Sequence, residues 1–230
     1  SPSPPWPENL LSFSRIDFAK VYLPMTAAVF PHHHEAEIPA HIQGLIFDCD
    51  GTLIDTMPIH FRAWTQALAP TGLAFSEERF YSFAGVPTQK IVEVISAEQG
   101  IKVDAPAIAH LKEELYTQMM PEALPIDEVI NIARREKGRR KLAVASGGWH
   151  ALVEKALKMV HCDTLFDTIV GADEVVHGKP HPDMFLEAAR RLGVAPQNCI
   201  VYEDGEAGFQ AARAAGMPVI DVRPWYLPRK

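Results

Sequence analysis

Two aspartates spaced two residues apart have the clearest chemical potential in this sequence. Asp48 and Asp50 follow a short apolar run at 44–47 and precede Gly51, which permits a tight turn. In extended backbone, side chains two positions apart leave on the same side, so the two carboxylates would lie together. Neighbouring carboxylates repel each other unless a cation or a shared proton intervenes. The motif therefore predicts a cation site or a proton-sharing pair.

A second acidic pair lies far along the chain. Glu203 and Asp204 come at the end of an apolar run that begins at Cys199. If such runs are parallel strands, their carboxyl ends meet at one edge of a sheet, where ligands of these folds bind. Clustered acidic oxygens suit a hard divalent cation, and Mg²⁺ is the usual choice beside phosphate. A calcium-binding loop starting at Asp48 is disfavoured, because its twelfth position would be Ile59 rather than Glu.

Two further polar positions occur in order with the acidic pairs. Ser146 ends an apolar run and precedes Gly147 and Gly148, whose backbone N–H groups predict an anion-binding nest. Lys179 lies in a loop before a helix expected from Pro182. Taken singly, Ser-Gly-Gly is a common turn and a lysine is usually solvated. Their order along one predicted sheet edge favours a shared site.

The wider pattern predicts an α/β fold with a doubly wound, mainly parallel Rossmann-like sheet. Apolar runs of strand length occur at 44–47, 141–146, 168–171, 199–203 and 218–222. Helical periods follow the later runs at 151–160, 182–192 and 207–215. Strands and helices that alternate in this way imply right-handed crossovers.

One interval breaks this alternation. About a hundred residues separate Asp48 from Ser146, far more than one crossover helix needs. Four stretches in it have helical character: 58–69, 76–83, 87–99 and 105–120. The last has apolar residues three or four apart, which predict one buried stripe: Ile108, Leu111, Leu115 and Met119. We expect an inserted helical subdomain; the alternative is that these helices merely cover the sheet.

Composition excludes several classes of protein. The content of 47% hydrophobic and 22% charged residues is ordinary for a globular enzyme, and no apolar run approaches the roughly 20 residues of a membrane span. The net charge of −7 disfavours nucleic acid, whose binders present a basic face. Cys49, Cys162 and Cys199 form no CxxC pair, which predicts reduced thiols. We expect a cytoplasmic monomer with a small-molecule partner and no membrane partner.

Residues 1–40 are expected to be an N-terminal extension. The first seven residues hold four prolines, which disfavour regular structure. The segment lacks the basic and apolar regions of a secretory signal. His32, His33 and His34 form a run that we interpret as a polar linker rather than a metal site.

Taken together, the four motifs resemble those of the haloacid dehalogenase superfamily of phosphatases and phosphomutases. The motifs are the run from Asp48 to Asp55, then Ser146, then Lys179, then Glu203 with Asp204. The resemblance covers about residues 44–222. It implies a core domain at 41–57 and 123–230 and a helical cap domain at 58–122. Within the superfamily, the chain is similar to the beta-phosphoglucomutases and to the fructose-1-phosphatase-like sugar phosphatases.

The resemblance implies a role for each motif residue. Asp48 would be the nucleophile that accepts the phosphoryl group, and Asp50 would be the general acid and base. Ser146 and Lys179 would bind the phosphoryl oxygens. The cofactor would be Mg²⁺, and its implied ligands are Asp48, the Asp50 carbonyl, Asp204 and Glu203, the last directly or through a neighbouring group.

Candidate substrate-binding residues lie in the helical insert and beside Ser146: His60, Thr88, Lys90, Lys112, Gly147, Trp149 and His150. Lys90 and Lys112 could instead be solvated surface lysines. The mutase pattern has an arginine where Thr88 falls, which grips the distal phosphate of a bisphosphate. We therefore predict a Mg²⁺-dependent phosphatase for a small phosphorylated metabolite, most simply a sugar phosphate. A phosphosugar mutase is the nearest alternative, and a catalytically silent phospho-ligand-binding protein is a distant one.

Overall fold

The computed structural model describes residues 37–83, 86 and 88–226. Most of the extension expected at 1–40, including the histidine run at 32–34, lies outside these residues. Only the segment at 37–40 can be compared with that expectation, and it belongs to neither a helix nor a strand.

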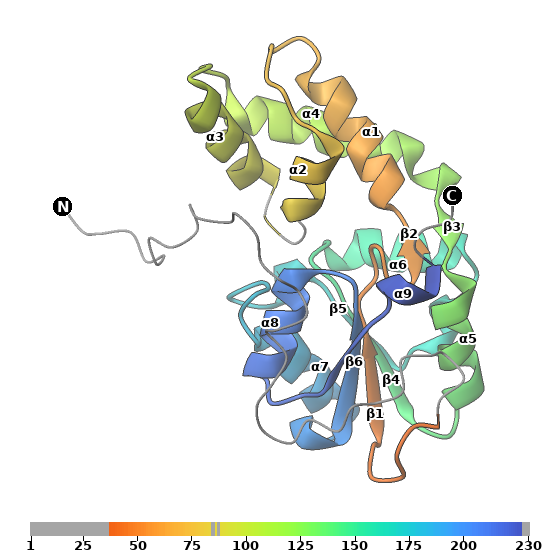
Figure 1. Cartoon of the computed structure of the whole chain (residues 1–230). Coiled ribbons are helices and arrows are strands. Elements are labelled where there is room, and N and C mark those ends of the chain that lie inside the picture. The colour runs from red at the N-terminus through yellow and green to blue at the C-terminus, as the bar shows by residue number, and fades with distance from the viewer. Residues whose placement is uncertain (1–36, 84–85, 87, 227–230) are drawn as a thin grey trace, which may run out of the picture.

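Five parallel strands form the central sheet, in the order β5-β4-β1-β6-β7 (Figure 1). They are β1 (Gly44–Phe47), β4 (Lys141–Ala145), β5 (Thr168–Val170), β6 (Cys199–Glu203) and β7 (Val219–Asp221). In the central register, Leu45 lies beside Leu142 on one side and Ile200 on the other. All four β1 residues are buried, as expected for a parallel strand covered on both faces. The predicted doubly wound sheet is confirmed.

Helices cover both faces of this sheet. Alternate β1 side chains point to opposite faces, so Leu45 and Phe47 share a core with α5 (Asp127–Glu136) and α6 (His150–Met159). Ile46 packs in a second core with α7 (Asp183–Leu192) and α8 (Glu206–Ala214). The remaining short helices of this region are η3 (Asp163–Leu165), η4 (Ala172–Glu174), η5 (Pro196–Asn198) and α9 (Arg223–Tyr226).

The chain leaves this three-layer unit once, to form what we call the helical insert. It contains α1 (Met57–Leu68), α2 (Glu77–Ser82), α3 (Thr88–Gln99), α4 (Ala105–Met119) and η2 (Met120–Glu122). The insert begins and ends at a small antiparallel sheet, where β2 (Ile54–Asp55) pairs with β3 (Leu124–Pro125). Its own apolar core surrounds Trp64, which is 2% exposed.

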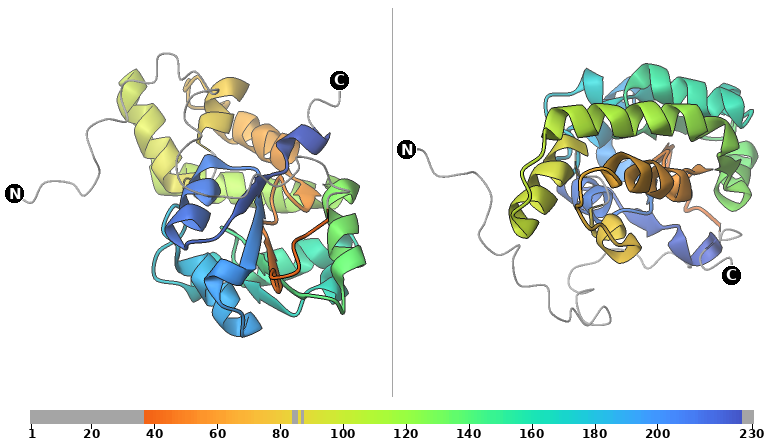
Figure 2. Two further views of the ribbon diagram at one scale, coloured as in Figure 1. Left: turned by 60° about the horizontal axis from the view of Figure 1, so that its bottom comes forward. Right: turned by 90° about the horizontal axis from the view of Figure 1, so that it is seen from above.

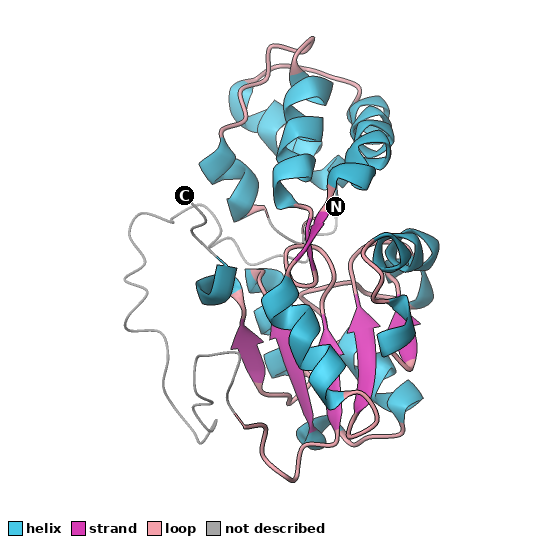
Figure 3. Ribbon diagram, turned by 90° about the vertical axis from the view of Figure 1, so that its right-hand side faces the viewer, coloured by secondary structure: helices cyan, strands magenta, loops and turns pink. Residues whose placement is uncertain are grey.

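The insert lies over the carboxyl ends of the strands. The strand arrows point toward it in the side view, and in the view from above its helices lie in front of the sheet (Figures 2 and 3). The residues that follow β1, β4 and β6 therefore lie beneath the insert.

The element boundaries agree with the sequence predictions to within one residue for every predicted helix and strand. The predictions did not include helix α5, the β2–β3 pair, α9 or the short helices η2 to η5. The predicted stripe on α4 was partly wrong. Leu111 is 38% exposed, whereas Lys112 and Tyr116 are buried. The helix thus turns two polar-tipped side chains inward.

The described residues also bear on the predictions about thiols and membrane spans. Cys49, Cys162 and Cys199 are all buried and free. Within the described part of the chain, no helix combines the length and apolarity that a membrane span requires.

Arg140 ties the start of the described chain to the sheet. Its Nε donates to the Ile42 carbonyl at 3.0 Å and its Nη2 donates to the Ile38 carbonyl at 3.0 Å. Its Nη1 also pairs with Glu136, whose side chain is 5% exposed. A planar guanidinium is suited to several simultaneous contacts of this kind.

Replacing Arg140 with methionine is expected to lower the free energy of unfolding by about 2 kcal/mol, because two carbonyls and a buried carboxylate lose a donor. Urea denaturation followed by circular dichroism measures this. Arg139→Met is the matched control, since Arg139 is exposed. An Arg140 variant as stable as wild type would show that these bonds do not hold the segment.

Candidate active site

A buried ammonium group lies at the centre of the site. Lys179 Nζ donates to Asp48 Oδ1 at 2.7 Å and to Glu203 Oε1 at 2.7 Å. None of these three side chains is more than 8% exposed. Asp48 follows β1, Glu203 ends β6, and Lys179 comes from the loop before α7. One cation thus joins three segments that are far apart in the sequence.

Asp204 adds a third carboxylate to this cluster. Asp48, Glu203 and Asp204 each offer an oxygen, and these oxygens lie within 4.8 Å of one another. The Thr52 hydroxyl donates to Asp204 Oδ1 at 3.4 Å. Three carboxylates therefore face one ammonium group, which leaves an excess of negative charge.

The electrostatics of the cluster follow from this excess. Burial raises the pKa of Asp48 to about 7, although the charge of Lys179 opposes the rise. Burial and the charges of Glu203 and Asp48 raise the pKa of Asp204 well above its usual range. Burial alone would lower the pKa of Lys179, but its two anionic partners raise it. Lys179 therefore remains charged.

Backbone geometry fixes the acidic side chains tightly. Glu203 Oε2 accepts from the backbone N–H groups of Asp204 at 2.6 Å and Gly205 at 2.8 Å. A Cβ atom at Gly208 would fall 1.7 Å from Glu203 Oε1. Gly51 has a φ of 78°, and a Cβ atom there would lie 2.2 Å from Asp204 Oδ2. Both glycines are needed for the carboxylates to approach the backbone this closely.

Asp50 lies beside the cluster but contacts the helical insert. The Tyr116 hydroxyl, from α4, donates to Asp50 Oδ1 at 3.2 Å. The Nε2 atom of His60, from α1, lies 3.8 Å from the same oxygen. Burial would raise the pKa of Asp50, but its interactions with His60 and Tyr116 outweigh burial and lower it to about 2.

A second lysine orients His60. Lys112 Nζ lies 3.0 Å from His60 Nδ1 and donates to Glu113 Oε1 at 2.9 Å. Thr88 donates to the same Glu113 oxygen at 2.6 Å. Burial and the charge of Lys112 lower the pKa of His60. Because an ammonium group can only donate, the neutral imidazole accepts at Nδ1 and carries its proton on Nε2, toward Asp50.

The loop after β4 contributes a hydroxyl and free backbone. Ser146 is fully buried, and its Oγ accepts from the Gly148 N–H at 3.1 Å. A Cβ atom at Gly147 would meet nothing within 4 Å, so this glycine borders open space. Trp149 is 68% exposed. The His150 backbone and ring are bound to Asp173 at 2.8 Å and Glu174 at 2.7 Å, which directs the ring toward η4.

The structure thus brings most of the predicted site residues together. The exceptions are Lys90, the exposed Trp149 and His150, whose ring is bound to Glu174. Lys90 is exposed on α3 and pairs with Glu93 at 3.4 Å rather than with any group of the carboxylate cluster. Lys112, for which a solvated alternative was open, is 3% exposed and faces His60. Sequence reasoning missed Tyr116 and Glu113. Tyr116 lies four positions after Lys112 on one helix, and this spacing is the signal that was available.

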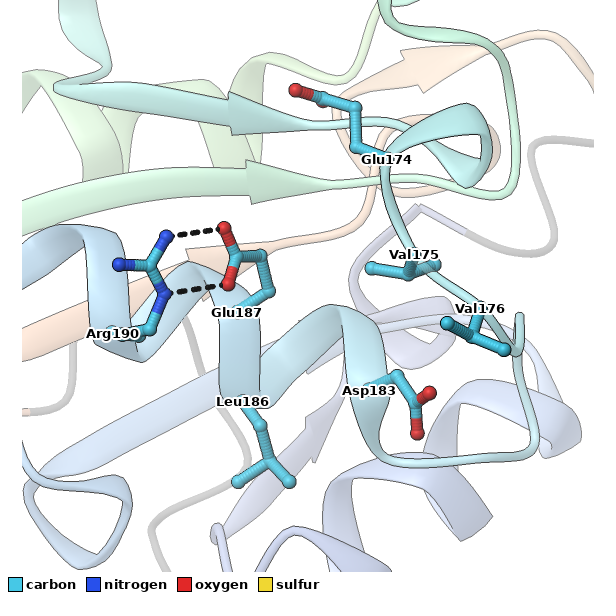
Figure 4. A pocket seen from close by; sticks show the side chains of 7 residues that line it. All are labelled: Glu174, Val175, Val176, Asp183, Leu186, Glu187 and Arg190. Atoms are coloured by element: carbon cyan, nitrogen blue, oxygen red, sulfur yellow. Dashed lines mark hydrogen bonds and ion pairs between the residues drawn. The ribbon is translucent and has the colours of Figure 1, made fainter.

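A shallow depression of about 310 Å³ lies elsewhere, along α7 (Figure 4). Its lining residues are Glu174, Val175, Val176, Asp183, Leu186, Glu187 and Arg190. Within it, Arg190 forms hydrogen bonds to Glu187 at 2.7 and 2.8 Å. It contains none of the clustered carboxylates, and we assign it no part in the chemistry.

Comparison with known proteins decides the family. The model of the haloacid dehalogenase-like hydrolases matches residues 42–216, which include every motif residue described above. The chain belongs to this family. The resemblance predicted from the sequence is therefore confirmed, and the chain is a haloacid dehalogenase-like hydrolase.

Individual members of the family are similar to this chain over most of its length. Fructose-1-phosphate phosphatase YqaB of Escherichia coli is 39% identical over 180 residues, covering 78% of this chain and 96% of that protein. The beta-phosphoglucomutase of Bacillus subtilis is 29% identical, covering 79% and 83% of the two chains. The solved beta-phosphoglucomutase of Clostridium difficile superposes with a TM-score of 0.68 at 27% identity, covering 78% and 84%.

For this hydrolase, replacing Lys179 with methionine in the presence of a chelator is expected to destabilise the fold by about 3 kcal/mol at pH 8, because two buried carboxylates lose their cation. Without Lys179 the pKa of Asp48 rises above its value of about 7, so the folded state binds a proton that the unfolded state lacks. Stability of the variant therefore falls as pH rises through neutrality, and the cost is smaller at pH 6. Urea denaturation at both pH values tests this.

Lys155→Met, at an exposed position of α6, is the matched control. An equal cost of the Lys179 substitution at pH 6 and pH 8 would contradict this electrostatic account.

Proposed function

We propose that this hydrolase is a Mg²⁺-dependent phosphatase that cleaves a small sugar phosphomonoester through an aspartyl-phosphate intermediate. The observation that carries the proposal is the arrangement around Asp48. Its carboxylate is buried, is held by Lys179 at 2.7 Å, and lies among two further carboxylates at the end of β1. Asp50, two residues on, has a separate hydrogen-bonded environment suited to proton transfer.

In the first step, an Asp48 oxygen attacks phosphorus and the bond to the sugar oxygen breaks. Lys179 holds Asp48 in the orientation for attack and offers charge to the phosphoryl oxygens. The hydroxyl of Ser146 and the backbone at Gly147, in the loop after the strand next to β1, would donate to the phosphoryl group. The negative charge of the bound phosphate favours the protonated form of Asp50, which gives its proton to the departing sugar oxygen.

In the second step, Asp50 acts in the opposite sense. As a carboxylate it accepts a proton from water, whose oxygen attacks the phosphoryl group on Asp48. The bond between Asp48 and phosphorus breaks, and inorganic phosphate leaves. The helical insert covers the strand ends, and we propose that residues 58–122 act as the cap domain of a core formed by 41–57 and 123–230. A cap of this kind limits access of water before the sugar has left.

The residues present fit a divalent cation. Oxygens of three carboxylates lie within 4.8 Å of one another, and one lysine balances only part of their charge. A hard cation would add positive charge and so lower the raised pKa of Asp204. Asp48, the Asp50 carbonyl and Asp204 would hold Mg²⁺, with Glu203 beside them. When bound, Mg²⁺ would supply charge that offsets repulsion between the Asp48 carboxylate and the phosphoryl oxygens.

Two residues of the insert favour hydrolysis over transfer between sugar positions. Thr88 stands where the mutase pattern has arginine, and its hydroxyl is bound to Glu113. The ammonium of Lys112 is engaged by His60 and Glu113. Thr88 is uncharged and the Lys112 ammonium is already engaged, so neither is available to bind a second phosphate. The similarity to a fructose-1-phosphate phosphatase also supports hydrolysis rather than mutase activity.

Replacing Asp48 with asparagine is expected to lower kcat for p-nitrophenyl phosphate with Mg²⁺ by about a thousandfold or more, because the nucleophile is lost. Release of p-nitrophenolate measures this, and a chelator should abolish wild-type turnover. Asp127→Asn is the matched control, since the Asp127 side chain is 63% exposed at the start of α5. An active Asp48→Asn variant would eliminate the nucleophile assignment.

Product analysis separates phosphatase from mutase. With fructose 1-phosphate or β-glucose 1-phosphate, we expect inorganic phosphate and free sugar in equal amounts, because the phosphoryl group passes to water. Coupled assays for phosphate and for glucose 6-phosphate measure the two outcomes. Accumulation of glucose 6-phosphate from β-glucose 1-phosphate would favour the mutase instead.

A further inference from the structure

The two oxygens of Asp50 have different surroundings. Oδ1 faces the insert, where it accepts from the Tyr116 hydroxyl at 3.2 Å and lies 3.8 Å from His60 Nε2. Oδ2 faces the loop after β4. A Cβ atom at Gly148 would lie 4.0 Å from Oδ2 and 3.5 Å from the Ser146 hydroxyl oxygen. One oxygen is therefore held by the insert, and the other is directed toward the proposed phosphoryl-binding loop.

We propose that Tyr116 is a positioning residue that occupies Oδ1 of Asp50 and thereby reserves Oδ2 for proton transfer at the leaving oxygen. This inference rests on the proposed function, in which Asp50 is the general acid and base. It assigns a part in the reaction to a residue that is neither a phosphate ligand nor a metal ligand.

The Tyr116 hydroxyl is fixed in place by its ring. Tyr116 is 6% exposed, and its ring stacks on His60, with 3.9 Å between ring centroids and 6° between planes. The Lys112 ammonium lies 5.1 Å from the Tyr116 ring centroid, and it also contacts His60. A phenol keeps its proton at neutral pH, so the Tyr116 hydroxyl is the donor to the Asp50 carboxylate.

This placement defines the path of the proton. As the bond from Asp48 to phosphorus forms, the bond from phosphorus to the leaving oxygen breaks. The proton on Asp50 Oδ2 passes to that oxygen, and Asp50 becomes a carboxylate. The hydrogen bond from Tyr116 to Oδ1 stabilises the charge that Asp50 gains. In the second step Oδ2 accepts the proton that water loses, and the starting form is restored.

The test uses Tyr116→Phe, which keeps the ring and its stacking on His60 but removes the hydroxyl. We compare kcat/KM, which reports the steps up to release of the leaving group, for two substrates with Mg²⁺. Fructose 1-phosphate has an alkoxide leaving group that needs a proton, whereas p-nitrophenolate leaves with little help. We expect kcat/KM for fructose 1-phosphate to fall about tenfold more than kcat/KM for p-nitrophenyl phosphate, as expected for one hydrogen bond to a charged group.

Two further variants make the outcome decisive. Tyr81→Phe removes the hydroxyl of another insert tyrosine, which is 42% exposed, and should not discriminate between the substrates. Asp50→Asn should discriminate in the same direction as Tyr116→Phe and more strongly. If Asp50→Asn fails to discriminate, the proposed function of Asp50 is wrong. If Asp50→Asn discriminates but Tyr116→Phe affects both substrates equally or neither, the positioning role of Tyr116 is overturned.

Discussion

The site depends on one buried ion pair arrangement, in which Lys179 lies between Asp48 and Glu203. Removing carboxylates from water is costly unless a cation and hydrogen bonds replace the lost solvation. Lys179 supplies the cation, and the backbone N–H groups after Glu203 supply hydrogen bonds. Because its partners belong to β1 and β6, the same ammonium also fixes the loop before α7 against the central strands. The same ion pairs therefore balance the buried charge and hold the strand ends in position.

The strand ends and the helical insert supply different groups to the site. The strand ends supply the acidic cluster, which includes the proposed nucleophile, and the loop proposed to bind phosphate. The insert supplies His60, Lys112 and Tyr116, which contact one another and reach the core through Asp50. Asp50 is thus a polar side chain at which the two parts meet, beside the apolar contacts that Ile59 and Met119 make with the main core. Its chemistry depends on both, which explains why its pKa is lowered while the pKa of neighbouring Asp48 is raised.

The sheet and the motif residues were predictable because their signals are local. Each buried strand is a short apolar run that ends at a polar residue, and parallel strands place those ends at one edge. The inner face of the insert was harder to predict. A helical period alone cannot decide between Leu111 and its neighbour Lys112 as the inward residue, and the partner of Lys112 is 52 positions away in the sequence. The buried state of a lysine becomes apparent only when that partner is in place.

The β2–β3 pair has an evolutionary consequence. The chain enters and leaves the helical insert through two adjacent antiparallel strands, with Ile54 opposite Pro125. The ends of the insert are therefore close together whatever lies between them, so lengthening or replacing it adds little loop-closure entropy. Mutations can accumulate in its helices while the sheet and its ion pair stay intact. The insert can thus change in sequence largely on its own, limited by its contacts with Asp50 and by the residues of α1 and α4 that share the core of β1.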